Sequence, residues 1–319
     1  MKAAATDLAI SARGLQRAFA GNMAVASLDL DVQRGEMFGL VGPDGAGKST
    51  AIRLLCGLLK PNAGAATVLD LDLVRQADEI KRHIGYLSQN FTLYGDLTID
   101  ENIEFFAELH GVGGWPARRD ELLAFTRLTP FRRRLAGALS GGMKKKLALA
   151  CTLIHTPQLI FLDEPSTGVD PVSRGEFWSI LSGLLAQGVT ILMTTPYLDE
   201  AERCHRIALL HRGRVMRAGT PTEIKAALPG RIYRLASPSL TAAYQALRAQ
   251  RSAERLVLYG DRLHLWSPAG GEEEARTAVA ELEARGLGPA QFQESTPTLE
   301  DVFVGLLGTE GAKNENPKV

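Results

Sequence analysis

Short apolar runs recur along the chain, each bounded by glycine, acidic residues or a polar turn. The clearest lie at residues 37–41, 158–162 and 188–194. Because short runs with little alternation are typical of strands buried on both faces, they predict core strands. Residues 27–32 alternate apolar and polar positions, as a half-buried strand does, and residues 50–55 predict the first turns of a helix.

The pattern becomes mostly helical between residues 91 and 157. Thr98 and Glu101 form a capping box that opens one predicted helix, and residues 119–128 predict another. A third helix follows, whose lysines at 144–146 are expected to form an exposed face. We therefore expect a helical subdomain inserted within the first domain.

The pattern restarts after a Pro-Gly turn at residues 229 and 230. It predicts strand, helix, strand, strand, helix and strand, at residues 231–236, 240–250, 255–259, 262–266, 272–285 and 290–294. This order indicates a small ferredoxin-like α+β domain. The chain is thus expected to contain a first domain at 1–229 and an accessory domain at 230–307. Thr298 should cap a last helix, and the polar stretch 308–319 is predicted to be disordered.

Composition limits the function classes. Lys plus Arg and Asp plus Glu each number 36, so the formal net charge is zero, which argues against a broad nucleic-acid surface. The three cysteines are scattered and lack metal-ligand spacing, which suits a reducing compartment. The N-terminus has no signal-peptide pattern, and no apolar run is long enough to cross a bilayer. A role at a membrane would therefore require another protein to span it.

One glycine-rich loop carries the clearest chemistry. Its sequence GPDGAGKST comprises Gly42, Pro43, Asp44, Gly45, Ala46, Gly47, Lys48, Ser49 and Thr50. Glycines let successive amide N–H groups approach and cradle phosphates, and the following helix N-terminus favours negative charge. Lys48 would add a point charge for the outer phosphates, while the Ser49 hydroxyl can ligate Mg²⁺. The alternative is a chance match in a glycine-rich turn, which the strand before and the helix after the loop disfavour.

Two adjacent acids, Asp163 and Glu164, follow the strand at 158–162. Buried charge needs a partner, and Mg²⁺ would provide one for Asp163, while Glu164 could act as general base on a water molecule. The alternative is an acidic turn at the strand exit. Gln89 also ends a predicted strand, and its position alone leaves a phosphate-site role and a solvated loop residue equally open.

Two further features carry weaker signals. Ser140, Gly141 and Gly142 begin a helix and could form a second anion site, although such helix starts are common. Phe19 precedes the glycine loop and could stack on adenine, or it could only pack on the sheet.

Taken together, the motifs resemble the ATP-binding subunit of ABC transporters over about residues 8–223. The loop at 42–50 resembles the Walker A motif, and Gln89 falls at the Q-loop glutamine. LSGGM at 139–143 resembles the signature, LIFLDEP at 159–165 the Walker B strand, and STGVD, which ends at Asp170, the D-loop. The C-terminal module with TPTLEDVF is similar to that of ABC-2-type multidrug exporter ATPases.

The resemblance implies an α/β P-loop NTPase core and a transport-coupled ATPase whose cofactors are ATP and Mg²⁺. Mg²⁺ would be held by Ser49, Gln89 and Asp163, with Glu164 and Gln89 as the catalytic residues. Two such subunits would face each other head to tail, so that Ser140, Gly141 and Gly142 would complete the ATP site of the partner. The expected partners are multi-span permease subunits and a second ATPase. The expected location is peripheral, on the cytoplasmic face of the membrane, with no nucleic-acid partner.

Two positions depart from the family pattern, and the change at Met143, where glutamine is usual, is the milder one. Pro196 replaces the histidine that follows the strand ending ILMTT, and proline lacks both a side-chain donor and an amide N–H. His205 lies further along and should not reach the site. We therefore expect this chain's own site to bind ATP but hydrolyse it slowly, and the chain to pair with a competent second ATPase. Two alternatives remain: a homodimer that turns over normally because Thr194 or Thr195 compensates, and a regulatory subunit that closes on ATP with little hydrolysis.

Overall fold

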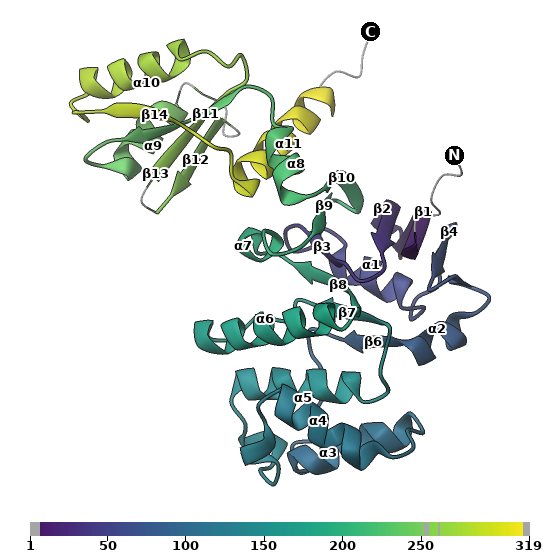
Figure 1. The fold of residues 1–319 in the computed structure, drawn as a ribbon. Helices are drawn as coiled ribbons and strands as arrows, with labels where there is room; N and C mark the ends of the chain where they lie inside the picture. The colour runs from purple at the N-terminus through teal and green to yellow at the C-terminus, as the bar shows by residue number, and fades with distance from the viewer. Residues whose placement is uncertain (1–6, 250, 252–254, 261, 315–319) are drawn as a thin grey trace, which may run out of the picture. The chain divides into compact units, whose positions relative to one another are not determined.

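The computed structural model describes residues 7–249, 251, 255–260 and 262–314. The chain divides into two compact units, Met1–Arg217 and Ala218–Val319 (Figure 1). The division falls earlier than the predicted boundary at residue 229. The reason is that α8 (Pro221–Ala226) packs against α11 (Leu299–Asn314) and so joins the second unit.

A ten-stranded sheet forms the centre of the first unit, in the order β5-β4-β1-β2-β10-β9-β3-β8-β7-β6. The strands are β1 (Leu8–Phe19), β2 (Asn22–Gln33), β3 (Met37–Val41), β4 (Ala63–Val68), β5 (Leu71–Asp72), β6 (Ile84–Leu87), β7 (Leu159–Asp163), β8 (Thr190–Thr195), β9 (Arg206–His211) and β10 (Arg214–Gly219). Strands β9, β3, β8, β7 and β6 pair in parallel, whereas β1, β2, β4 and β5 pair antiparallel. The carboxyl ends of the five parallel strands therefore lie along one edge.

The parallel strands are buried because their side chains are apolar on both faces. Every residue of β3, β7 and β8 is buried. Helix α1 (Lys48–Leu55) packs against β7 and β8 and buries Ala51, Ile52, Leu54 and Leu55. The predicted strand at 37–41 matches β3 residue for residue, since a continuous apolar run is what a strand covered on both faces requires.

Three helices, α3 (Ile99–Leu109), α4 (Trp115–Phe125) and α5 (Gly141–Leu153), pack on one another as a separate group (Figure 1). The predicted capping box is confirmed: the Glu101 amide donates to Thr98 Oγ1 at 3.2 Å, and the Thr98 amide donates to Glu101 Oε2 at 2.8 Å. Helix α6 (Pro171–Ala186) packs against α5, whereas α2 (Ala77–His83) packs against β5 and β6, and α7 (Leu198–Ala201) packs against β3 and β8. Short 3-10 turns lie at Thr129–Phe131 and Ala136–Ala138.

The exposed lysine face predicted on α5 is wrong for two of its three lysines. Lys146 is only 6% exposed and forms an ion pair with Glu176 of α6 at 2.5 Å. Lys145 donates from Nζ to the Gln89 carbonyl oxygen at 3.0 Å. Local charge pattern could not reveal these partners because both are distant in sequence.

The second unit has the predicted ferredoxin-like topology. Its elements are β11 (Arg231–Ala236), α9 (Leu240–Arg248), β12 (Leu256–Tyr259), β13 (Arg262–Ser267), α10 (Glu273–Ala284), β14 (Gln291–Ser295) and α11. The strand order is β12-β13-β11-β14 with antiparallel pairs. Tyr233, Leu263 and Leu265 from the sheet and Leu247 and Leu282 from the helices form its core.

The predicted disordered tail is wrong for residues 308–314, because α11 continues to Asn314. Leu299 and Val302 anchor the start of this helix in the core, and propagation of an established helix gains one hydrogen bond for each added residue. Residues 315–319 lie outside the described part of the chain. Among the described residues, no helix combines the length and apolarity that crossing a bilayer demands.

Candidate nucleotide site

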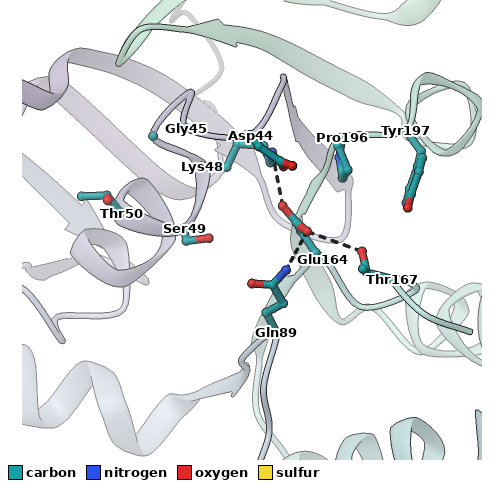
Figure 2. A pocket seen from close by; sticks show the side chains of 11 residues that line it. Asp44, Gly45, Lys48, Ser49, Thr50, Gln89, Glu164, Thr167, Pro196 and Tyr197 are labelled. Atoms are coloured by element: carbon teal, nitrogen blue, oxygen red, sulfur yellow. Dashed lines mark hydrogen bonds and ion pairs between the residues drawn. The ribbon is translucent and has the colours of Figure 1, made fainter. Parts of the chain in front are cut away.

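Four adjacent parallel strands end at one cavity of about 440 Å³. The glycine loop follows β3, Gln89 follows β6, Glu164 follows β7, and Pro196 follows β8. The cavity is lined by Asp44, Gly45, Gly47, Lys48, Ser49, Thr50, Gln89, Glu164, Thr167, Pro196 and Tyr197. Figure 2 shows the loop on one side and Pro196 and Tyr197 on the other, with Glu164 between them. Ligands of open α/β sheets bind at this edge, beyond the carboxyl ends of the strands.

The loop needs glycine for packing as well as for phosphate approach. A Cβ on Gly42 would lie 2.2 Å from the Leu210 carbonyl oxygen, and one on Gly47 would lie 2.3 Å from that of Ala24. Gly47 also has a φ of 102°, in the left-handed region that favours glycine. Helix α1 starts directly after this residue without a side-chain cap, so its first amide N–H groups are available to an anion.

Lys48 is a buried cation at the centre of the site. Its side chain is 4% exposed, and Nζ donates to the carbonyl oxygens of Gly42 at 2.8 Å and Pro43 at 3.1 Å. Nζ also lies 3.2 Å from Glu164 Oε1. Glu164 therefore has an ionic partner within the protein itself.

Asp163 has one committed and one free carboxylate oxygen. Its Oδ1 accepts from Ser49 Oγ at 3.0 Å and from Thr194 Oγ1 at 2.7 Å. Its Oδ2 is buried without a hydrogen-bond partner among the described residues. Because an unpaired buried carboxylate oxygen is costly, and because Mg²⁺ prefers hydroxyl and carboxylate oxygens, this pair of side chains fits a magnesium ion.

Glu164 is held toward the cavity from several sides. Its backbone has a φ of 48°, which is uncommon for a residue with a side chain, and its amide donates to Thr194 Oγ1 at 3.0 Å. Its Oε2 accepts from Gln89 Nε2 at 3.0 Å and from Thr167 Oγ1 at 3.4 Å (Figure 2). Strained backbone of this kind is often found at functional sites, where the surrounding contacts maintain it.

Pro196 occupies the cavity wall where a histidine was expected. The next residue, Tyr197, also lines the cavity. His205 cannot substitute, because its Nδ1 accepts from the Met37 amide at 3.0 Å. Met37 begins β3, and the glycine loop follows the opposite end of that strand. The geometry therefore places no histidine of the described residues in the lining of this cavity.

The remaining candidate residues lie outside the cavity lining. Ser140 caps α5 by accepting from the Met143 amide at 3.3 Å, and a Cβ on Gly142 would lie 2.3 Å from Ser173 Oγ. Asp170 caps α6, and hydrogen bonds from Ser173 lower the pKa of this carboxyl below its usual value.

Phe19 is the last residue of β1. The Phe19 side chain is 42% exposed, with the Arg17 guanidinium 4.7 Å from the ring centroid. Its proposed stacking on adenine remains a prediction.

Sequence reasoning missed two lining residues, Thr167 and Tyr197. It considered Thr194 only as a substitute for the histidine, whereas the structure uses this hydroxyl to orient Asp163 and Glu164. The signal was the pair of threonines that ends β8, since hydroxyls at the end of a buried strand must find polar partners.

Comparisons with known proteins agree with this geometry. The family model described as ABC transporter matches residues 25–167. The probable multidrug ABC transporter ATP-binding protein YbhF of Escherichia coli K12 is 39% identical over 98% of this chain. The chain spans 54% of that relative's length.

Two further proteins align over more of their own length than YbhF does. The daunorubicin/doxorubicin resistance ATP-binding protein DrrA of Streptomyces peucetius is 36% identical over 94% of this chain and 92% of its own length. The ATP-binding cassette MJ0796, solved as a dimer in a post-hydrolysis state with ADP and Pi, is 26% identical. Its TM-score is 0.61, with 66% of this chain and 98% of that chain covered.

Proposed function

Because this chain belongs to the family of ABC transporter ATP-binding proteins, we propose that it is the ATP-binding and ATP-hydrolysing subunit of an exporter. The observation that carries the proposal is the convergence of Lys48, Ser49 and Glu164 on one polar cavity. Asp163 is buried next to this cavity and accepts a hydrogen bond from Ser49. Export is supported by the names of two relatives, the probable multidrug ABC transporter ATP-binding protein YbhF and the daunorubicin/doxorubicin resistance ATP-binding protein DrrA. The exported compound would be recognised by separate membrane subunits.

The residues of the site would have different roles in binding and hydrolysing ATP. The amide groups of the glycine loop and Lys48 would bind the phosphates, and the Ser49 hydroxyl and the free Asp163 oxygen would hold Mg²⁺. When bound, this ion neutralises charge on the phosphate oxygens. Glu164 would act as general base on the attacking water, oriented by Gln89 and Thr167. This role requires Lys48 to release its ion pair with Glu164 and to bind the phosphates instead.

Assembly would follow the dimeric arrangement of MJ0796. Ser140, Gly141 and Gly142 lie outside this chain's own cavity, as residues that complete a partner's site should. The complex would sit on the cytoplasmic face of the membrane, bound to multi-span permease subunits.

Pro196 supports slow hydrolysis at this chain's own site and an unequal pair of ATPase subunits. A water molecule bound at Glu164 would lack the side-chain donor that a histidine at position 196 would supply. The same observation favours a second candidate function, an ATP-gated regulatory subunit that closes on ATP with little turnover.

The test is steady-state phosphate release by the purified chain and its Pro196→His variant. We expect the wild type to be slow and the variant to be faster by about 100-fold, because the loss of one positioned hydrogen-bond donor typically slows a reaction by about 10²–10³. Lys48→Ala should abolish nucleotide binding in both. Brisk turnover by the wild type alone would exclude the asymmetric form of the proposal, and equal nucleotide binding with and without Lys48 would exclude the site itself.

A further inference from the structure

Glu200 is a buried carboxylate that does not line the cavity and has no part in the chemistry described above. Glu200 belongs to α7, four positions after Pro196, and is 1% exposed. Burying a charge is costly unless hydrogen bonds and opposite charges compensate. Its partners therefore indicate what this carboxylate holds in place.

Both oxygens of Glu200 bond to hydroxyl groups from different segments. Ser166 Oγ donates to Oε1, and Thr195 Oγ1 donates to Oε2 at 2.7 Å. The guanidinium of Arg174, on α6, approaches Oε1 with its Nε at 3.7 Å. Glu200 thus joins the segment after β7 to the end of β8.

These two segments form two walls of the cavity. Ser166 precedes Thr167, which lines the cavity and donates to Glu164. Thr195 precedes Pro196 and Tyr197, which also line it, and Thr195 Oγ1 accepts from the Tyr197 amide at 3.0 Å. The Thr195 hydroxyl therefore closes a turn around Pro196, and Glu200 fixes that hydroxyl.

The walls joined by Glu200 lie on the Glu164 side of the cavity, across from the glycine loop (Figure 2). If Glu164 is the general base, this side must face the terminal phosphate, because that phosphate is the one attacked by water. The loop amides would hold the inner phosphates, whereas the side-chain hydrogen bonds of Glu200 go to Ser166 and Thr195, outside the loop.

We propose that Glu200 is a positioning residue that sets the spacing of the Thr167 and Pro196 walls around the terminal phosphate, and so gives the site its preference for a nucleoside triphosphate over a diphosphate. This inference rests on the proposed function, because it assumes that the cavity binds ATP. Glu200 itself touches no substrate.

The experiment measures dissociation constants of the full-length chain for Mg²⁺ with ADP and with a non-hydrolysable ATP analogue. Glu200→Ala is expected to weaken binding of the analogue about tenfold and to leave ADP binding within about twofold, since hydroxyl contacts to a charged group are lost on one side of the site only. Glu200→Gln keeps an acceptor and a donor for the two hydroxyls and should restore analogue binding to within about threefold of wild type. Asp199→Ala removes the neighbouring exposed acid and serves as the matched control.

A general structural role for Glu200 predicts a different result. Loss of stability alone would weaken both nucleotides equally or neither, and that outcome would overturn the inference. If Glu200→Ala does not fold, Thr195→Val and Ser166→Ala each remove one of the two hydroxyl hydrogen bonds to Glu200. Each of these variants must then lower affinity for the analogue but not for ADP if the inference is to stand. A wild-type chain that binds neither nucleotide refutes the proposed function, and the inference falls with it, whereas equal effects on both nucleotides refute only the role of Glu200.

Discussion

The ion pair between Lys48 and Glu164 is expected to compete with nucleotide for Lys48. In this structure Nζ lies 3.2 Å from Glu164 Oε1, and the two side chains are only 4% and 9% exposed. Phosphates that recruit Lys48 must therefore weaken this pair, and the Glu164 carboxylate must also tolerate a second negative charge nearby. Glu164→Gln removes both costs and should tighten nucleotide binding.

The size of the effect follows from the contacts of Lys48. A hydrogen bond to a charged group contributes about 1.5–3 kcal/mol. Lys48 keeps its bonds to the Gly42 and Pro43 carbonyl oxygens in the variant, so the lower end of this range applies. Since about 1.4 kcal/mol corresponds to a factor of ten, we expect affinity to rise about tenfold.

The assay is titration calorimetry with ADP and with a non-hydrolysable ATP analogue, so that turnover does not enter the comparison. Lys146 and Glu176 form a comparable partly buried pair, with side chains 8% and 33% exposed, away from the cavity. Glu176→Gln should therefore lower stability but leave nucleotide affinity unchanged. Equal or weaker binding by Glu164→Gln would show that Lys48 is not restrained by Glu164, and the reasoning would fail.

Two other substitutions test the packing. Burial raises the pKa of the Asp301 carboxyl, but hydrogen bonds from His264 and Thr298 have the larger combined effect and lower this pKa. The Asp301 carboxylate therefore stabilises the fold above about pH 4, and this contribution is lost as the pH falls through the lowered pKa. Asp301→Asn should cost about 2 kcal/mol of unfolding free energy at pH 7 in denaturant titrations and approach the wild type in acid. Gly42→Ala would place a Cβ 2.2 Å from a carbonyl oxygen of β9 and should abolish nucleotide binding, whereas Gly175→Ala meets nothing within 4 Å and should bind normally. A Gly42→Ala variant with wild-type nucleotide affinity would contradict the expectation for Gly42.

Local sequence patterns predicted the elements whose environment is uniform. The apolar run at Met37–Val41 is a strand because both faces are buried, and Thr98 with Glu101 caps a helix through contacts three residues apart. The ferredoxin-like order of the second unit followed from alternating elements and turns, and the topology confirms it. In each case the physical cause lies within a few residues of the pattern.

Contacts between distant segments could not be predicted in the same way. Lys48 meets Glu164, and Thr194 meets Asp163, only because β3, β8 and β7 are neighbours in the sheet. A buried lysine on α5 looked exposed for the same reason, since its partner Glu176 belongs to another helix. The motifs predicted which segments would meet at the candidate site. The ion pair and hydrogen bonds between those segments could be identified only from the fold.

The site combines Glu164, the proposed general base, with a wall at Pro196 that lacks a side-chain donor, and this contrast bears on the two candidate functions. Glu164 is held by Lys48, Gln89 and Thr167 in a strained backbone conformation. A subunit that only binds ATP has no need of a carboxylate at this position, because a neutral residue would avoid the repulsion between Glu164 and phosphate. Pro196 removes a donor without disturbing any of these contacts. The arrangement therefore favours a site that retains hydrolysis at a reduced rate over one that has lost it.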